Sequence, residues 1–168
     1  MQNSNNKYRV SVVIVSTKGA RGEREDLVAP ALEPILSAAG FHLEDSRIIT
    51  DDRGAIADLL CELTDHQKVD LILTSGGTGL SPSDLTPEAT EDVAHRLIPG
   101  LAEAMRASGR AITPHADLSR AVCGQRSCSL IINLPGSPKG AVENLTTILP
   151  ALKHALDKIQ GDPADCAR

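Results

Sequence analysis

Residues 71–89 read LILTSGGTGLSPSDLTPEA, and the rest of the sequence is arranged around this stretch. The apolar run at 69–73 predicts a buried strand, which leads into the loop 74–79 with three glycines and three hydroxyl side chains. Glycine adopts the positive φ angles that turn successive backbone N–H groups toward one anion. After the loop, Thr86 is a favourable N-cap and Pro87 a favourable first residue of a helix. The stretch therefore predicts a phosphate-binding turn between a strand and a helix.

The loop matches neither of two well-known nucleotide-binding motifs. No lysine follows Gly79, as a Walker loop requires, and Pro82 with several polar residues separates the loop from the helix, unlike a Rossmann turn. Glycine pairs also end ordinary strands. The loop by itself therefore leaves two interpretations open, a ligand-binding turn and a simple strand end.

The remaining pattern predicts an α/β fold. Further strands are expected at residues 9–16, 42–49 and 129–134. Helices are expected where apolar residues recur at helical spacing, at residues 27–39, 56–63, 89–97, 101–107 and 141–159. Apolar strands that alternate with helices are typical of a three-layer α/β/α sandwich with a mostly parallel sheet. The mixed segment 109–124 is expected to add an antiparallel edge strand or a small hairpin.

The length of 168 residues suits a single domain over residues 1–168, with a core at about 9–160 and flexible ends. Pro34 is expected to kink its helix or to remove one of its hydrogen bonds. Pro150 is expected to divide the last helix or to begin its second half.

Composition excludes several classes of function. The formal net charge of −5 argues against a nucleic-acid or anionic-membrane surface. One Tyr, one Phe and no Trp leave no aromatic platform for stacking bases. No apolar run is long enough to span a membrane, and the polar N-terminus lacks a signal peptide, so the expected location is the cytoplasm. The four cysteines have no zinc-binding spacing and are expected to be reduced thiols without a chemical role, at Cys61, Cys123, Cys128 and Cys166.

Several polar segments follow strands, and the carboxyl ends of parallel strands meet at one edge of a sheet. We therefore expect Asp51, Asp84, the long polar loop 16–26 and the turn PGSP at 135–138 to share one cleft. Two anion-binding turns and two carboxylates suit a nucleoside triphosphate with Mg²⁺, and equally any phosphorylated ligand. For Asp52, and less so for Asp51, simple helix capping is the alternative. The candidate ligand-binding residues are Ser75, Gly76, Gly77, Thr78, Gly79, Pro135, Gly136, Ser137 and Pro138.

Other polar residues are interpreted more simply. Lys18, Arg21 and Arg24 are expected to be solvated surface charges. His115, beside a proline in a loop, is a candidate ligand or base, although a bystander role is the more common one for such a residue. Contact of Lys139 with phosphate is left open.

Longer motifs resemble those of the MogA/MoaB family of molybdenum-cofactor biosynthesis proteins. They are TSGGTGLSPSDLTPEAT at 74–90 and NLPGSPKGAVENL at 133–145, accompanied by ITDD at 49–52 and LSRAVCG at 118–124. The resemblance runs from about residue 10 to residue 161. It departs at Val28-Ala29, where many members have Ser-Gly, so the contacts of this loop with a pterin are expected to differ.

The resemblance implies a homotrimer, or a homohexamer, that binds molybdopterin and transfers AMP to it from Mg-ATP, with release of pyrophosphate. The family's two important aspartates correspond to Asp51 and Asp84, which would hold Mg²⁺ through the phosphates, and its two loops to residues 75–79 and 135–138. Ser119 and Arg120 match a further family motif. The product would pass to a molybdenum-insertion protein.

Two other functions are compatible with the same motifs. One is a paralogue that binds molybdopterin, or serves as a scaffold, without adenylylating it. The other is a nucleotide or pyridine-nucleotide hydrolase, which would need a positioned water and an additional domain. Retention of Asp51 and Asp84 favours the transferase.

Overall fold

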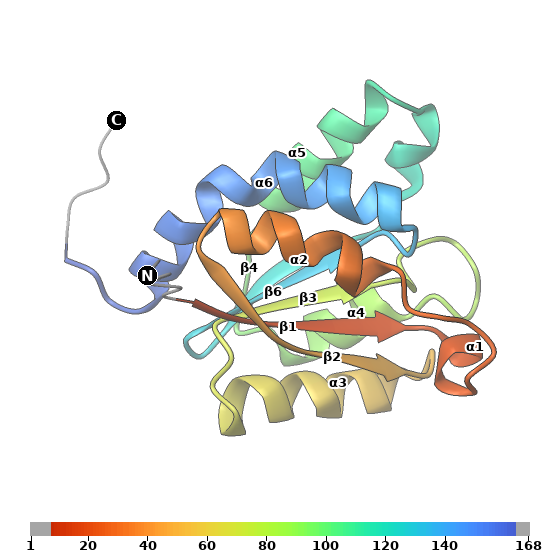
Figure 1. Ribbon diagram of the computed structural model, residues 1–168, viewed down its shortest axis with the longest axis horizontal. Coiled ribbons are helices and arrows are strands. Elements are labelled where there is room, and N and C mark those ends of the chain that lie inside the picture. Colours follow the sequence, from red (N-terminus) through yellow and green to blue (C-terminus); the bar gives the residue numbers. More distant parts are fainter. Residues whose placement is uncertain (1–7, 164–168) are drawn as a thin grey trace.

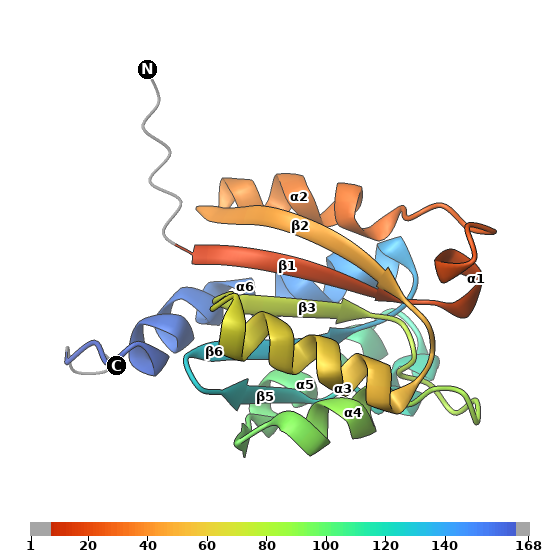
Figure 2. The same ribbon diagram turned by 90° about the horizontal axis from the view of Figure 1, so that it is seen from below.

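The computed structural model describes residues 8–163, which fold around one six-stranded sheet. Across the sheet the order of strands is β2 (Phe41–Ile49), β1 (Tyr8–Val15), β3 (Leu71–Ser75), β6 (Ser129–Leu134), β5 (Cys123–Arg126) and β4 (Arg96–Leu97). The first four strands are parallel, and the pairings at one edge are antiparallel, of β5 with β6 and of β4 with β5 (Figure 2). The predicted mostly parallel sheet with an antiparallel edge is confirmed.

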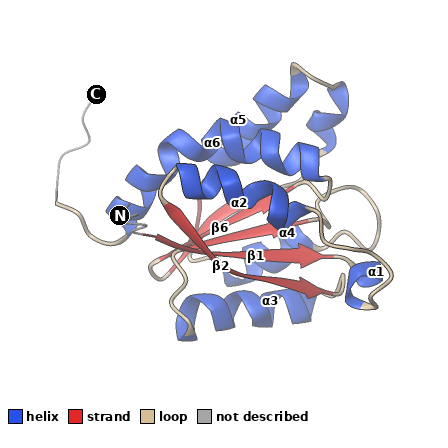
Figure 3. Cartoon of the chain, viewed as in Figure 1, coloured by secondary structure: helices blue, strands red, loops and turns tan. Residues whose placement is uncertain are grey.

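Helices cover both faces of this sheet (Figures 1 and 3). One face carries α2 (Val28–Ala38), α5 (Pro99–Arg110) and α6 (Pro138–Ile159), and the other carries α3 (Arg53–Cys61) and α4 (Thr86–Val93). Three shorter helical segments are α1 (Thr17–Ala20), a π-helical turn at Glu62–His66 and a 3₁₀ turn at Pro114–Leu118. The three-layer α/β/α architecture therefore agrees with the expectation.

The alternation of side chains along β1 shows why the sheet needs two helical layers. Val10 and Val12 pack into the apolar cluster under α2 and α6, whereas Val13 and Val15 pack into the cluster under α3 and α4. All four side chains are buried. A strand with apolar residues on both sides is stable only when both faces of the sheet are covered.

The expected N-cap role of Thr86 is wrong. Leu85 occupies the cap position of α4, and Thr86 is the first helical residue. The Thr86 hydroxyl instead donates a hydrogen bond of 2.9 Å to the carbonyl of Gly76. A hydroxyl that caps a helix locally can equally satisfy a carbonyl across a loop, and here the tertiary contact prevails.

The segment after α4 also differs from the expectation. The helix predicted over 89–97 ends at Val93, and Arg96–Leu97 forms the edge strand β4 with Leu97 exposed. Most of the segment 109–124, for which an edge strand or hairpin was expected, is not a strand: it contains the 3₁₀ turn Pro114–Leu118, and the antiparallel hairpin lies further along the chain, between β5 and β6. Pairing with β5 decides the conformation of residues 96–97, and local periodicity carries no information about such a partner.

Neither internal proline breaks its helix. α2 continues through Pro34, and α6 is one helix of 22 residues through Pro150. Pro150 and Thr146, whose carbonyl loses its helical partner, are both exposed, so water can bond to this carbonyl. The buried stripe of α6, which includes Leu145, Ile148 and Leu152, stabilises the continuous helix against the sheet.

The described cysteines Cys61, Cys123 and Cys128 are free thiols. Burial raises the pKa of the Cys123 thiol to about 12, which keeps it protonated and unreactive. Cys166 lies outside the described residues. Within residues 8–163, no helix combines the length and the apolar character that a membrane crossing requires.

Candidate functional site

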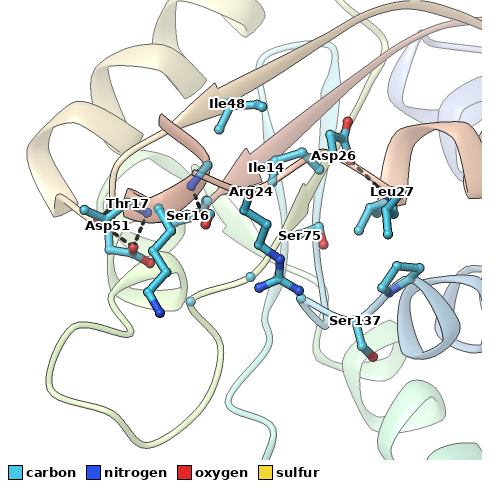
Figure 4. A pocket seen from close by; sticks show the side chains of 18 of the residues that line it. Ile14, Ser16, Thr17, Arg24, Asp26, Leu27, Ile48, Asp51, Ser75 and Ser137 are labelled. Atoms are coloured by element: carbon cyan, nitrogen blue, oxygen red, sulfur yellow. Dashed lines mark hydrogen bonds between the residues drawn. The ribbon is translucent and has the colours of Figure 1, made fainter. Parts of the chain in front are cut away.

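The parallel strands β1, β2, β3 and β6 end at the same edge of the sheet, and a cavity of about 640 Å³ opens there (Figure 4). Both predicted carboxylates, Asp51 and Asp84, line it. The loop 16–26 contributes most of one wall. The glycine turns add Ser75, Gly76, Gly77, Gly136, Ser137 and Pro138. The predicted convergence of four distant segments is thus found in the fold.

Asp51 follows β2, and its carboxylate is held by Thr17, the first residue of the short helix α1 that follows β1. One carboxylate oxygen, Oδ2, accepts hydrogen bonds from the backbone N–H and the hydroxyl of Thr17, both at 2.7 Å (Figure 4). The neighbouring Asp52 caps α3 instead, accepting from the N–H of Ala55. The capping interpretation was therefore right for Asp52, and Asp51 has a different position facing the cavity.

Asp84 lies at the end of the loop between β3 and α4. Its Oδ2 accepts a hydrogen bond of 3.0 Å from the N–H of Ser81. Its own N–H donates to the carbonyl of Ser81 at 2.9 Å, which closes a tight turn. Like Asp51, Asp84 is therefore oriented by a backbone N–H group and is partly accessible from the cavity.

The first glycine turn presents backbone donors without partners. Among residues 8–163, the N–H groups of Gly77, Thr78 and Gly79 donate no hydrogen bond. Gly76 and Gly77 have φ angles of +103° and +65°. A Cβ on Gly76 would lie 2.4 Å from the Val15 carbonyl oxygen, so this position requires glycine on steric grounds as well. Consecutive unpaired N–H groups after positive φ angles form a concavity suited to anions.

The second turn lies against the first. The hydroxyl of Ser75 donates to the carbonyl of Pro135 at 2.8 Å, and a Cβ on Gly136 would lie 3.3 Å from the Cα of Gly76. Ser137 caps α6 by accepting from the N–H of Gly140. The N-terminus of this long helix therefore points toward the two turns and favours negative charge there.

A second cavity of about 530 Å³ lies on the other side of the glycine turn. Thr78, Gly79 and Pro135 line it rather than the first cavity, and Ser137 lines both. The candidate binding residues therefore divide between two adjacent cavities. His115, Ser119 and Lys139, whose roles the sequence left open, also line the second cavity, together with apolar residues that include Met105, Ile112 and Leu118.

Two cations in the first cavity were missed. Lys18 and Arg24 are exposed, as expected of solvated surface charges, but both also line the cavity, and Figure 4 shows the Arg24 side chain pointing into it. Arg21 is exposed and lines neither cavity, so for Arg21 the expectation holds. The unusual length of the polar loop 16–26 was the signal that these residues belong to a site.

Two further residues line the second cavity although nothing in the sequence marked them as members of a site. Asn133 is fully buried within the apolar run of β6, and its amide donates to the hydroxyls of Thr74 and Thr90, each at 2.9 Å. Arg106 on α5 donates to the carbonyl of Ala121 at 3.0 Å. Both residues line the second cavity, and both have partners far away in the sequence.

The departure at Val28-Ala29 has a defined structural setting. Both N–H groups donate to Oδ1 of Asp26, at 2.8 and 3.2 Å, and both residues are buried at the start of α2. Val28 lines the first cavity and offers an apolar surface where a serine would offer a hydroxyl. The helix start is thus retained while the chemistry of this wall changes.

The carboxylates fit a magnesium ion only in company with a substrate. Within residues 8–163, no group of three or more His, Cys, Asp or Glu is arranged to hold a metal ion. Asp51 and Asp84 provide the hard oxygen ligands that Mg²⁺ prefers, and this ion usually takes one or two carboxylates together with phosphate oxygens and water. The cavity therefore suits a metal that arrives with phosphate groups.

Comparisons with known proteins agree with this arrangement. The model of a family described as "Probable molybdopterin binding domain" matches residues 11–154. A molybdopterin adenylyltransferase of Helicobacter pylori is 39% identical over 158 residues, covering 91% of this chain and 88% of that protein. The Escherichia coli K12 molybdopterin adenylyltransferase is 42% identical over 149 residues, covering 87% and 76%. The crystal structure of the molybdopterin biosynthesis enzyme MoaB of Thermus thermophilus superimposes with a TM-score of 0.87 at 47% identity, covering 94% of this chain and 99% of that one.

Proposed function

The chain belongs to the family of the probable molybdopterin binding domain, and from that premise we propose that it is a molybdopterin adenylyltransferase of molybdenum cofactor biosynthesis. It binds molybdopterin and ATP, transfers AMP to the molybdopterin phosphate and releases pyrophosphate. Relatives with this name are 39% and 42% identical over most of the chain.

The observation that carries the proposal is the pair of cavities that meet at the glycine turn. A transferase must hold two substrates with their reacting groups in contact. Cavities of about 640 and 530 Å³, which share Ser137, are each in the size range of small-molecule sites. The first is lined by Asp51 and Asp84, by the further acidic residues Glu25 and Asp26, and by the cations Lys18 and Arg24, and we place the phosphoryl chemistry there because it holds the two candidate metal-binding carboxylates.

The reaction needs no protein nucleophile. An oxygen of the molybdopterin phosphate attacks the α-phosphorus of ATP, the bond to the β-phosphate breaks, and pyrophosphate leaves with its electron pair. The free N–H groups of residues 77–79 lie where the two cavities meet, with Gly77 lining the first cavity and Thr78 and Gly79 lining the second, and together with the N-terminus of α6 they hold phosphate oxygens of the two substrates; the first cavity is the one with Asp51 and Asp84. Lys18 and Arg24 add positive charge to the same cavity. Catalysis then consists of positioning and electrostatic stabilisation.

Asp51 and Asp84 would hold Mg²⁺ together with substrate phosphates. When bound, the ion neutralises the charge on the transferred phosphoryl group and on the leaving pyrophosphate. The contribution of the chain is to keep the two carboxylates oriented through Thr17 and Ser81.

The assembly and cellular setting follow from the family premise. We place the protein in the cytoplasm as a homotrimer or homohexamer that passes its adenylylated product to a molybdenum-insertion protein. Light scattering combined with size-exclusion chromatography measures the assembly directly, and a stable monomer would contradict this part of the proposal.

An adenylylation assay tests the activity. Purified protein is incubated with molybdopterin, ATP and Mg²⁺, and each component is omitted in turn, while pyrophosphate and adenylylated pterin are measured. Both products are expected only in the complete mixture. Binding of pterin in isothermal titration without Mg-dependent ATP affinity would indicate a non-catalytic paralogue instead. ATP turnover without pterin would indicate a hydrolase.

A further inference from the structure

Arg120 is bonded to the glycine turn that separates the two cavities, but it lines neither of them. Its Nε donates to the carbonyl of Gly79 at 2.8 Å, and its Nη2 donates to the carbonyl of Asp84 at 2.6 Å. Nη1 bonds to the Glu88 carboxylate, and the backbone N–H of Arg120 donates to the carbonyl of Thr78 at 2.9 Å. One residue thus holds both ends of the loop from Gly79 to Asp84.

The loop itself has few other attachments. Among residues 8–163, the hydrogen bonds of residues 80–83 all stay within the turn 81–84. Residues 80–83 are exposed. The turn is therefore internally ordered, and its position relative to the rest of the cavity depends on where its ends are held. The Asp84 carboxylate belongs to the residue at one of these ends, whose carbonyl accepts from Arg120, and it lies close to the other end, because its Oδ2 would be 2.9 Å from a Cβ on Gly79.

Arg120 is in turn anchored from the opposite side. Arg106 on α5 donates through Nη1 to the carbonyls of Ser119 and Ala121, at 3.4 and 3.0 Å. These two carbonyls flank Arg120, and Ser119 and Ala121 line the second cavity. A continuous set of hydrogen bonds therefore connects the wall of the second cavity with the Asp84 loop of the first.

The chemistry of the contacts requires a guanidinium group. Two backbone carbonyls and one carboxylate accept from three different nitrogens of Arg120. The planar guanidinium presents its donors in a fixed fork, whereas a lysine ammonium is a compact charge on a flexible stem and does not reproduce three diverging bonds. The second oxygen of Glu88 is buried without a hydrogen-bond partner among the described residues, so Arg120 also compensates this charge.

We propose that Arg120 is a positioning residue of the adenylyl transfer, which fixes the loop 79–84 and thereby the place of the Asp84 carboxylate in the first cavity. The inference rests on the proposed function for its kinetic consequence and on the hydrogen bonds alone for its structural consequence. Removal of the fork leaves the glycine turn and Asp84 present but lets the loop move.

The test uses full-length protein with Arg120→Lys, and with Arg120→Gln combined with Glu88→Gln, so that no unpaired carboxylate is left. Arg126→Lys is the matched control, because Arg126 also binds a carboxylate and a backbone carbonyl, of Asp65 and Val93, away from both cavities. Arg120 variants are expected to lower kcat by about ten- to a hundredfold, the range for groups that orient metal ligands, with a smaller change in KM for ATP. The control should keep the wild-type kcat.

Two further measurements distinguish a residue that positions Asp84 from one that only stabilises the fold. In an Asp84→Asn background, Arg120→Lys should lower kcat further by less than about twofold, because coupled residues are not additive. Amide hydrogen exchange of residues 79–85 should accelerate in the Arg120 variants and not in Arg126→Lys. Unchanged exchange, or fully additive losses in kcat, would overturn the proposal. If wild-type protein formed no adenylylated pterin, the proposed function would fail, whereas the exchange measurement would still decide whether Arg120 holds the loop.

Discussion

Asp51 and Thr17, 34 residues apart, are joined by two hydrogen bonds of 2.7 Å that end on the same carboxylate oxygen. The pair connects the end of β2 with the end of β1 and orients the carboxylate toward the cavity. The N–H of Asp51 also donates to the Thr17 hydroxyl at 3.2 Å, so the contact is reciprocal. Such a fixed carboxylate needs little rearrangement when a charged ligand binds, which is the condition for electrostatic catalysis.

Asp51→Asn should abolish most of the activity while leaving the fold intact. The asparagine oxygen can still accept from Thr17, but the negative charge is gone, and we expect kcat to fall by about two to three orders of magnitude. Asp52→Asn is the control, because asparagine caps a helix as well as aspartate does. Steady-state adenylylation and thermal unfolding of both variants provide the measurement. Equal activity of the two variants would remove Asp51 from the mechanism.

Arg24→Gln should weaken the binding of ATP more than it lowers kcat. Arg24 points into the first cavity, and loss of one charge-assisted contact with phosphate corresponds to about a tenfold rise in KM. Arg21→Gln changes an exposed arginine of the same loop that lines neither cavity, and should have no effect at moderate salt. The affinity for a non-hydrolysable ATP analogue is measured at two salt concentrations, because salt screens the long-range attraction of surface charges more strongly than a direct contact in the cavity. An equal loss of affinity in both variants would show that Arg24 acts through the net charge of the surface and not through a contact with phosphate.

Gly76→Ala should destabilise the protein more than Gly22→Ala. Both residues have positive φ angles, of +103° and +73°, but only at Gly76 does a Cβ approach a carbonyl, whereas nothing lies within 4 Å at Gly22. Gly22→Ala should therefore cost only the backbone strain, about 1–2 kcal/mol, and Gly76→Ala more than that. Urea unfolding of the two variants compares the costs. Equal losses would show that the turn can shift away from Val15.

The stability of the chain should depend on a carboxylate at the other end of the sheet. The hydrogen bond from Arg126 holds the pKa of Asp65 below its ordinary value of 3.8. Because the folded-state pKa is depressed, the contribution of Asp65 is complete above 3.8 and is lost as the pH falls through the lower folded-state value. Urea unfolding of wild type and Asp65→Asn from neutral pH to about pH 3 measures this contribution. Their difference in unfolding free energy should shrink on acidification, and should be small at every pH when Arg126 is replaced by Gln.

The sequence predicted where the strands end and therefore which loops line the site. Strands at 9–16, 42–49 and 129–134 are recognisable from runs of adjacent residues, and the structure has β1, β2 and β6 there within one residue. The expectation that the loops after these strands meet at one edge follows from parallel topology. For Asp52, and less so for Asp51, helix capping was the alternative, and in the structure Asp52 caps α3 whereas Asp51 does not.

Other features could not be predicted because their partners are distant. The length of the loop 16–26 indicates a site, but the sequence does not say which charged residues of this loop line the cavity, and the structure shows that Lys18 and Arg24 do and Arg21 does not. The edge strand β4 is defined by its pairing with β5, and residues 89–97 fit a helix when that pairing is unknown. The continuity of α6 through Pro150 depends on burial of its apolar stripe rather than on local propensity.

The layered fold and the two glycine turns are readable from adjacent residues alone, because burial pattern and φ preference are short-range properties. That the turns separate two cavities, and that Arg120 holds Gly79 and Asp84 from 41 and 36 residues away, emerges from the folded chain. A side chain satisfies its hydrogen-bond donors wherever the completed fold presents acceptors, and these acceptors come into place only when all strands and helices are packed together.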